Sequence, residues 1–172
     1  VAVRERTIEL SSATRNSSIS FDAMTASVVA VHTDARKNGR PLTGLAFDSI
    51  GRYGHGGLLR ERFIPRLVAA DPDSYAGGNG GIDPHRAWAV MMKDEKPGGH
   101  GERSGAVGML DAALWDLAAK AADLPLWSLL AKRHGAADAG PKIAIYCSGG
   151  HYRASNDIEG LCDDLRRAIG QG

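Results

Sequence analysis

The sequence has few of the features that mark membrane, secreted and zinc-binding proteins. Two of its 172 residues are cysteines, and aromatic residues make up 6%. Cys147 and Cys162 lack the CxxC spacing of zinc sites and do not form the dense pattern of a disulfide framework. No segment approaches the roughly 20 apolar residues of a membrane span, and no apolar signal core follows the first residues. We therefore expect a cytoplasmic protein with two reduced thiols and no membrane partner.

An excess of charge of one sign is also missing. The 21 Lys and Arg residues are balanced by 20 Asp and Glu residues, which gives a net charge of +1. The two signs are interspersed, whereas a protein that binds nucleic acid gathers positive charge on one face. The balance therefore argues against a nucleic-acid partner. Hydrophobic residues make up 43% of the chain, enough at this length for one well-packed core.

Three segments near the N-terminus predict β-strands. They are Ala2–Leu10, Ala26–Thr33 and Leu42–Phe47, in which Val, Ile and Leu recur among polar residues. Asn38-Gly39 joins the last two segments, and this pair favours the positive φ angles of a tight hairpin turn. We expect a small antiparallel sheet with one face covered by helices.

The middle of the chain predicts helices. The first covers about Leu58–Ala70, where Pro65 removes a hydrogen bond or bends the helix. Asp83-Pro84 then reads as an N-cap followed by a first-turn proline. Ser104 is the predicted N-cap of a long helix, and Asp123-Leu124-Pro125 ends that helix.

The last part of the chain predicts the beginning of a second domain. A short helix ends at Gly135, and Ala136–Pro141 follows as a linker of small residues. Ile143–Tyr146 predicts an apolar strand, and Ile158–Ile169 predicts a helix. One strand and one helix cannot close a sheet or bury both of its faces. The predicted fold class is α+β, with one domain over residues 1–135 and the start of a β/α barrel over residues 136–172.

Three strings carry a resemblance to a known family. They are Gly51–Phe63 (GRYGHGGLLRERF), Glu95–Ser104 (EKPGGHGERS) and Ala112–Leu117 (AALWDL). The last resembles the mandelate racemase/muconate lactonizing enzyme branch of the enolase superfamily. The first two together resemble the D-tartrate dehydratase family, with similarity from about Arg4 to Arg166. The resemblance implies an enolase-like N-terminal capping domain, a three-stranded antiparallel sheet plus helices, followed by the first βα unit of a truncated TIM-type barrel.

The resemblance also implies a chemistry. Members of the family are Mg²⁺-assisted lyases that remove the proton next to a carboxylate and expel water, giving an oxaloacetate-type product. Their base and metal ligands come from later barrel strands, and no position of this sequence matches them. The implied substrate is a small-molecule hydroxy-dicarboxylate or acid sugar, and the implied full-length state is a homo-oligomer. We expect this chain to hold no catalytic residue and no metal, and to be inactive without the missing barrel domain. The alternative is a stand-alone binding module that is not an enzyme.

Two loops carry the substrate contacts that the resemblance implies. Asn16 matches a substrate-contacting amide, which can donate to a carboxylate and accept from a hydroxyl. Lys96 matches a lysine whose ammonium suits the distal carboxylate of a diacid. Ile50 stands where the family has a polar amide, which leaves the identity of the substrate open. The lid loops add three further candidates, Arg52, Tyr53 and His100.

Each candidate also has a structural interpretation. Asn16 in a Ser-rich loop is typical of a turn, and a surface lysine such as Lys96 is usually only solvated. His100 and Glu102 could suggest a metal pair, but the ligand set is incomplete, which favours a loop hydrogen bond or ion pair. Tyr53 and His55 are interpreted in the same way, as residues that order a loop rather than as acid/base catalysts.

Overall fold

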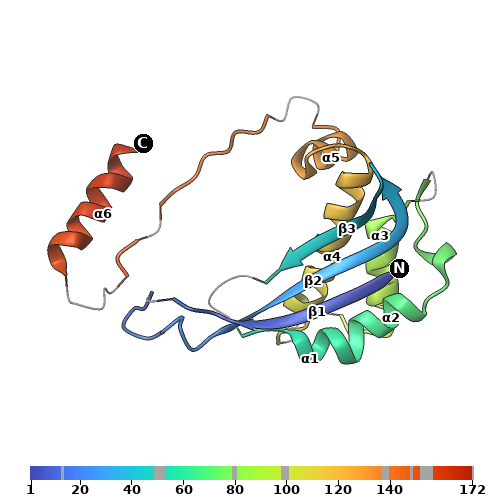
Figure 1. Ribbon diagram of the computed structural model, residues 1–172, viewed down its shortest axis with the longest axis horizontal. Helices are drawn as coiled ribbons and strands as arrows, with labels where there is room; N and C mark the ends of the chain where they lie inside the picture. The colour runs from blue at the N-terminus through green and yellow to red at the C-terminus, as the bar shows by residue number, and fades with distance from the viewer. Residues whose placement is uncertain are drawn as a thin grey trace.

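The structure is a computed structural model of the chain (Figure 1). It describes residues 1–12, 14–48, 53–78, 81–97, 101–136, 140–147, 149–151 and 157–171. A three-stranded sheet and a layer of helices form the main body, and one further helix lies apart from it. None of the helices in these ranges is long and apolar enough to cross a membrane.

The sheet confirms the predicted antiparallel hairpin arrangement. Its strands are β1 (Ala2–Glu9), β2 (Thr25–Lys37) and β3 (Arg40–Phe47), in the order β1-β2-β3. Both neighbouring pairs are antiparallel. Asn38 and Gly39 take φ angles of 51° and 76° in the turn between β2 and β3, a region that most side chains avoid and that Asn and Gly tolerate.

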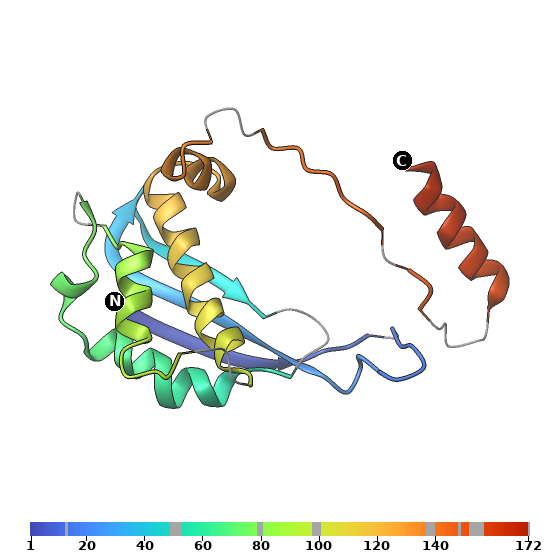
Figure 2. The ribbon, with the colours of Figure 1, turned by 180° about the vertical axis from the view of Figure 1, so that it is seen from behind.

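The two faces of the sheet differ in burial. Val29 and Val31 point to one face and are fully buried beneath the helices. Leu45 and Phe47 are exposed on β3. Figure 1 shows one face of the sheet open toward the viewer, and Figure 2 shows α3 (Pro84–Met91) and α4 (Arg103–Ala121) across the other. The burial of apolar groups between these two layers supplies the main driving force for folding of the body.

The helix predicted over residues 58–70 is present, and it contains a wide turn before its proline. It consists of α1 (Gly56–Leu58), a π-helical segment η1 (Leu59–Phe63) and α2 (Ile64–Ala69). Pro65 cannot donate a main-chain hydrogen bond, and in a regular helix its ring would crowd the carbonyl four residues earlier. The π turn lies where that crowding would occur, and it keeps the helix continuous. Leu59, Phe63 and Leu67 are fully buried against the sheet and α4.

The remaining helices of the body follow their predicted signals with one correction. The turn η2 (Pro72–Ser74) precedes α3, and Asp83 caps α3 by accepting from the main-chain N–H groups of His85 and Arg86. The prediction that Ser104 caps α4 is wrong, because the helix begins at Arg103 and its N-cap is Glu102. The Glu102 carboxylate is turned toward His55 instead of its own helix. α5 (Leu126–Arg133) follows the predicted break.

The predicted barrel strand is not formed. Ile143, Ile145 and Tyr146 lie in an irregular extended segment and are 84%, 86% and 91% exposed. A parallel barrel strand is stable when it pairs on both sides and is covered by helices, and no described residues pair with this segment. The predicted helix is confirmed as α6 (Ile158–Gly170), although none of its residues is buried. Figure 1 shows it separated from the body.

Candidate functional site

The loops that carry the predicted contacts begin or end at the same end of the sheet. Glu9 pairs with Thr25, so the connection between β1 and β2 leaves the sheet at this end. Val28 pairs with Phe47, which brings the segment after β3 to the same end. Hydrogen bonds from this segment reach residue 102, where α4 begins. We call this the loop end; it comprises residues 10–12 and 14–24, residue 48, residues 53–55, and residues 95–97 and 101–102.

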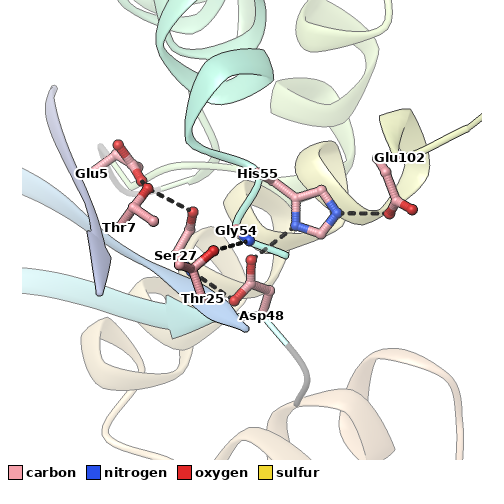
Figure 3. A network of polar contacts seen from close by, with 8 residues as sticks. All are labelled: Glu5, Thr7, Thr25, Ser27, Asp48, Gly54, His55 and Glu102. Atoms are coloured by element: carbon pink, nitrogen blue, oxygen red, sulfur yellow. Dashed lines mark hydrogen bonds and ion pairs between the residues drawn. The ribbon is translucent and has the colours of Figure 1, made fainter. Parts of the chain in front are cut away.

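His55 lies at the centre of the loop end (Figure 3). Its Nδ1 atom is 2.9 Å from Oδ2 of Asp48, and its Nε2 atom is 3.0 Å from Oε2 of Glu102. The side chains of His55 and Asp48 are 3% and 4% exposed, whereas that of Glu102 is 56% exposed. The other oxygen of Asp48 accepts the main-chain N–H of Ser27 at 2.7 Å. This interaction fixes the imidazole between the end of β3 and the start of α4.

A glycine on α4 makes room for the imidazole. A Cβ atom on Gly105 would lie 2.6 Å from Nε2 of His55, closer than non-bonded atoms approach. The ring is held by hydrogen bonds on both sides and cannot turn away without losing one of them. The sequence around the start of α4 is therefore adapted to the histidine.

A second polar network ties the first two strands to the following helix. The N–H of Gly54 donates to Oγ1 of Thr25 at 2.9 Å, and Oγ1 of Thr7 donates to Glu5 at 2.8 Å (Figure 3). The Glu5 carboxylate also pairs with Arg60. Together these contacts hold the chain just before α1 against the start of β2.

The stem of the Lys96 loop is held by a buried carboxylate. The Glu95 side chain is 1% exposed and pairs with Arg62 at 2.8 Å, with Arg66 at 2.6 Å and with Arg103 at 2.9 Å. Burial acts to raise the pKa of Glu95, but the hydrogen bonds from Arg66 and Arg103 outweigh it, and the pKa lies below its ordinary value. Arg103 also donates to the main-chain oxygen of Lys96 at 2.9 Å.

The structure places three of the predicted site residues. Asn16 forms a turn, in which its Oδ1 accepts from the N–H groups of Ser18 and Ile19 at 2.9 and 2.8 Å. This confirms the turn interpretation and leaves the side-chain NH₂ group outside these two bonds. Lys96 has an exposed side chain on a fixed stem, and Tyr53 is exposed. The other three predicted residues, Ile50, Arg52 and His100, lie outside the described residues.

Two structural interpretations of the sequence are confirmed, and two features were missed. His55 orders the loop end, and Glu102 makes a loop hydrogen bond. The role of Asp48 was not predicted, nor was the grouping of three arginines around Glu95. The latter had a signal, because Arg62 and Arg66 are four residues apart and therefore share one helical face.

Magnesium does not fit the described residues. Within the described ranges, no group of three or more His, Cys, Asp and Glu side chains could hold a metal ion. The Asp48 and Glu102 carboxylates are separated by an imidazole, whereas Mg²⁺ requires oxygen atoms converging in an octahedral arrangement.

A cavity of about 510 Å³ opens near the other end of the sheet. Small and apolar residues of α4 and α5 line much of it, with Asp34, Tyr75 and Arg133 among its polar groups. None of the residues that line it belongs to the loop end. It is therefore separate from the predicted substrate contacts.

Comparisons with known proteins give two similarities. No family model matches the chain. The chain is 27% identical over 143 residues to the D-galactonate dehydratase family member RspA of Halomonas elongata, a match that covers 81% of this chain and 27% of that protein. A mandelate racemase/muconate lactonizing enzyme-like protein from Rubrobacter xylanophilus is similar in structure, with a TM-score of 0.43 and 22% identity over 74% of this chain and 31% of that one. The chain thus spans about 27% of the length of the curated relative that it matches.

Proposed function

We propose that this chain is the substrate-selecting capping part of an acid-sugar dehydratase of the enolase superfamily. The sequence similarity to a D-galactonate dehydratase family member supports this assignment. The reaction of such an enzyme removes the proton next to a carboxylate and eliminates a β-hydroxyl as water. Magnesium would stabilise the dianionic intermediate of that reaction. Because the described residues do not fit this ion, the contribution of this chain is to bind and select the substrate.

The main support for the proposal is that the main chain at Lys96 is held in place while its side chain is exposed. Arg103 holds the main-chain oxygen of Lys96, and the buried Glu95 next to it is held by three arginines. The ammonium therefore projects from an ordered base into solvent, at the same end of the sheet as Asn16. A lysine supplies a compact positive charge, which suits the distal carboxylate of a dicarboxylic acid. We propose D-tartrate or a related hydroxy-dicarboxylate as the substrate, with Lys96 and Asn16 as its contacts.

The proposed function also gives a role to the C-terminal segment, residues 136–172. We propose that residues 1–135 form the capping domain and that residues 136–172 contribute the first strand and helix of a TIM-type barrel. The segment around Ile143 would then pair when the neighbouring barrel strands are present, and the apolar side of α6 would pack on them. We further propose that the base and the metal ligands belong to that barrel and that the complete enzyme is a homo-oligomer.

Substitution of Lys96 tests the proposal in the complete dehydratase that carries this segment. K96A removes a charge-assisted contact, which contributes about 1.5–3 kcal/mol and corresponds to a roughly 10- to 100-fold rise in KM. We expect this rise for D-tartrate and a much smaller one for the monocarboxylate D-galactonate, which has no distal carboxylate. K93A, at an exposed lysine three residues earlier, is the matched control and should leave both KM values unchanged. Equal effects of K96A on both substrates would refute the proposed role of Lys96.

A titration of the 172-residue chain separates this proposal from a stand-alone binding module. Isothermal calorimetry with D-tartrate and MgCl₂ should give no binding heat, because two side chains on one face supply few of the contacts that a small acid needs. Tight binding by the chain alone would instead support a binding module without catalysis.

A further inference from the structure

A series of hydrogen bonds, with one step along the main chain, runs from the sheet to Lys96. The N–H of Ser27 on β2 donates to Asp48, just after β3, and Asp48 contacts Nδ1 of His55 just before α1. Nε2 of His55 contacts Glu102, the N-cap of α4. The neighbouring residue, Arg103, donates to the main-chain oxygen of Lys96. The contacts of His55 thereby link the start of β2 to the start of α4, and Figure 3 shows this series as far as Glu102.

Burial makes the middle of this series stiff. His55 and Asp48 are almost inaccessible to water, so a broken hydrogen bond between them could not be replaced by one to solvent. Both ring nitrogens face a carboxylate oxygen, and each can donate only when it carries a proton. The ring is therefore held at both edges, and the absence of a side chain at Gly105 leaves room for Nε2.

We propose that His55 is a positioning residue that sets the position of Lys96 relative to the start of β2, at the loop end. This inference rests on the proposed function, in which Lys96 contacts the substrate. His55 acts at a distance, because its side chain is buried and both of its nitrogens are engaged by protein carboxylates. The start of β2 also ends the loop that carries Asn16, since Leu10 donates to the carbonyl of Met24 one residue before β2. His55 thus fixes the end of the Asn16 loop and the stem of the Lys96 loop relative to each other.

The charged groups nearest to this series are already paired. Arg60 contacts Glu5 on β1, beside Gly56. Arg62 and Arg66 contact Glu95, as does Arg103. Arg103 thereby connects two features: it contacts Glu95 and the main chain of Lys96, and it is the first residue of α4, whose N-cap is Glu102. A displacement of Glu102 should therefore move the Lys96 stem through Arg103.

The first test uses nuclear magnetic resonance on the 172-residue chain and needs no substrate. In H55Q, the amide resonance of Lys96 should shift, because one glutamine side chain cannot contact both the Asp48 and the Glu102 carboxylates. H32Q is the matched control, since His32 lies in the same strand as Ser27 and contacts Thr43 away from the loop end. An unchanged Lys96 amide resonance in H55Q would overturn the inference.

The second test uses kinetics of the complete dehydratase and variants at Glu102, whose half-exposed side chain can be changed without emptying the core. E102A should raise KM for the dicarboxylate about tenfold and change kcat less than twofold, because a misplaced Lys96 weakens binding of the ground state and the transition state alike. E102Q keeps an oxygen that accepts from Nε2 and should remain close to the parent enzyme. H32Q should match the parent enzyme in both constants.

The outcomes distinguish the inference from the proposed function. If K96A raises KM and E102A does not, His55 has no positioning role although Lys96 contacts substrate. If K96A leaves KM unchanged, the proposed function of Lys96 is wrong, and the Lys96 resonance in H55Q still decides whether His55 positions the stem. An equal effect of E102Q and E102A would also refute the inference, because the retained acceptor would then make no difference.

Discussion

Gly44 on β3 is a position where the fold tolerates no side chain. A Cβ atom built there would lie 2.0 Å from the main-chain oxygen of Ala113 and 2.8 Å from Cβ of Leu117, both on α4. Ordinary van der Waals contact of carbon with these atoms requires more than 3 Å. We predict that G44A forces α4 away from the sheet by about 1 Å or more.

The expected cost follows from what α4 buries. Leu110 and Leu114 on this helix are fully buried with Val29 and Val31 of the sheet. Overpacking of a core costs about 1–3 kcal/mol and sometimes more. The obstructing atom at Gly44 is a main-chain oxygen, which no rotamer change can move, so we expect a value near the upper limit, about 3 kcal/mol. For a body of this size, that corresponds to a fall in Tm of roughly 10 °C.

A second glycine provides the matched control. Gly108 lies within α4, and a Cβ atom built there has no neighbour within 4 Å. G108A should raise the free energy of unfolding by about 0.5–1 kcal/mol, because alanine loses less backbone entropy than glycine on entering a helix. The same chemical change is thus predicted to have opposite signs at two positions of one helix–sheet contact.

Urea unfolding followed by far-UV circular dichroism measures both effects. With a slope of about 1–3 kcal/mol/M, G44A should lower the midpoint by roughly 1–3 M, and G108A should raise it slightly. An unchanged midpoint in G44A would show that β3 and α4 are not in the contact described. A lower midpoint in G108A would show that its helical face is packed against something in solution.

Three further changes should alter stability in defined directions. E95Q should lower Tm most at neutral pH, because the pKa of Glu95 is lowered in the folded state. The stabilisation from the Glu95 carboxylate is complete above its ordinary pKa of 4.5 and is lost as pH falls through the folded-state pKa. Thermal melts across pH 3–7 in which the Tm values of E95Q and the parent ran parallel would contradict this. Burial raises the pKa of Asp111 above its ordinary value of 3.8, and a charge on His85 opposes this only in part. The ionised carboxylate is therefore disfavoured in the folded state, and D111N should raise Tm at pH 7 and have no effect below pH 3.8, as the same melts would show. G105A should lower Tm and shift the ring resonances of His55, and normal resonances would show that the ring has room to move.

Local signals explain the parts of the fold that were predictable. The Asn38-Gly39 turn and the Asp83 cap act within a few residues, and both are present as expected. Ser104 failed as a cap although its residue type favours that position. The N-cap lies two residues earlier, at Glu102, because the carboxylate of Glu102 contacts His55 and the guanidinium of Arg103 reaches back to Glu95. Tertiary contacts moved this boundary, and no local pattern contains them.

The strand predicted over residues 143–146 failed for a different reason. Its apolar composition is typical of a strand buried on both faces, and such strands form only when partners exist on both sides. The helix that follows could form by itself because its hydrogen bonds are internal, and Asp157 caps it through the N–H of Gly160. The difference between these two outcomes is therefore the difference between non-local and local hydrogen bonding.

The candidate site also contains some features that are defined locally in the sequence and others that depend on non-local contacts. Asn16 and Lys96 could be chosen from short strings, because each is defined by its loop. The contact of His55 with Glu102 spans 47 positions, and that of Glu95 with Arg62 spans 33. The spacing of Arg62 and Arg66 shows that two cations share a helical face, but it cannot select Glu95 from 20 acidic residues. Residues that are proposed to touch a ligand can be selected one at a time, whereas those proposed to position them act through pairs, and these pairs exist only once the sheet and α4 have packed together.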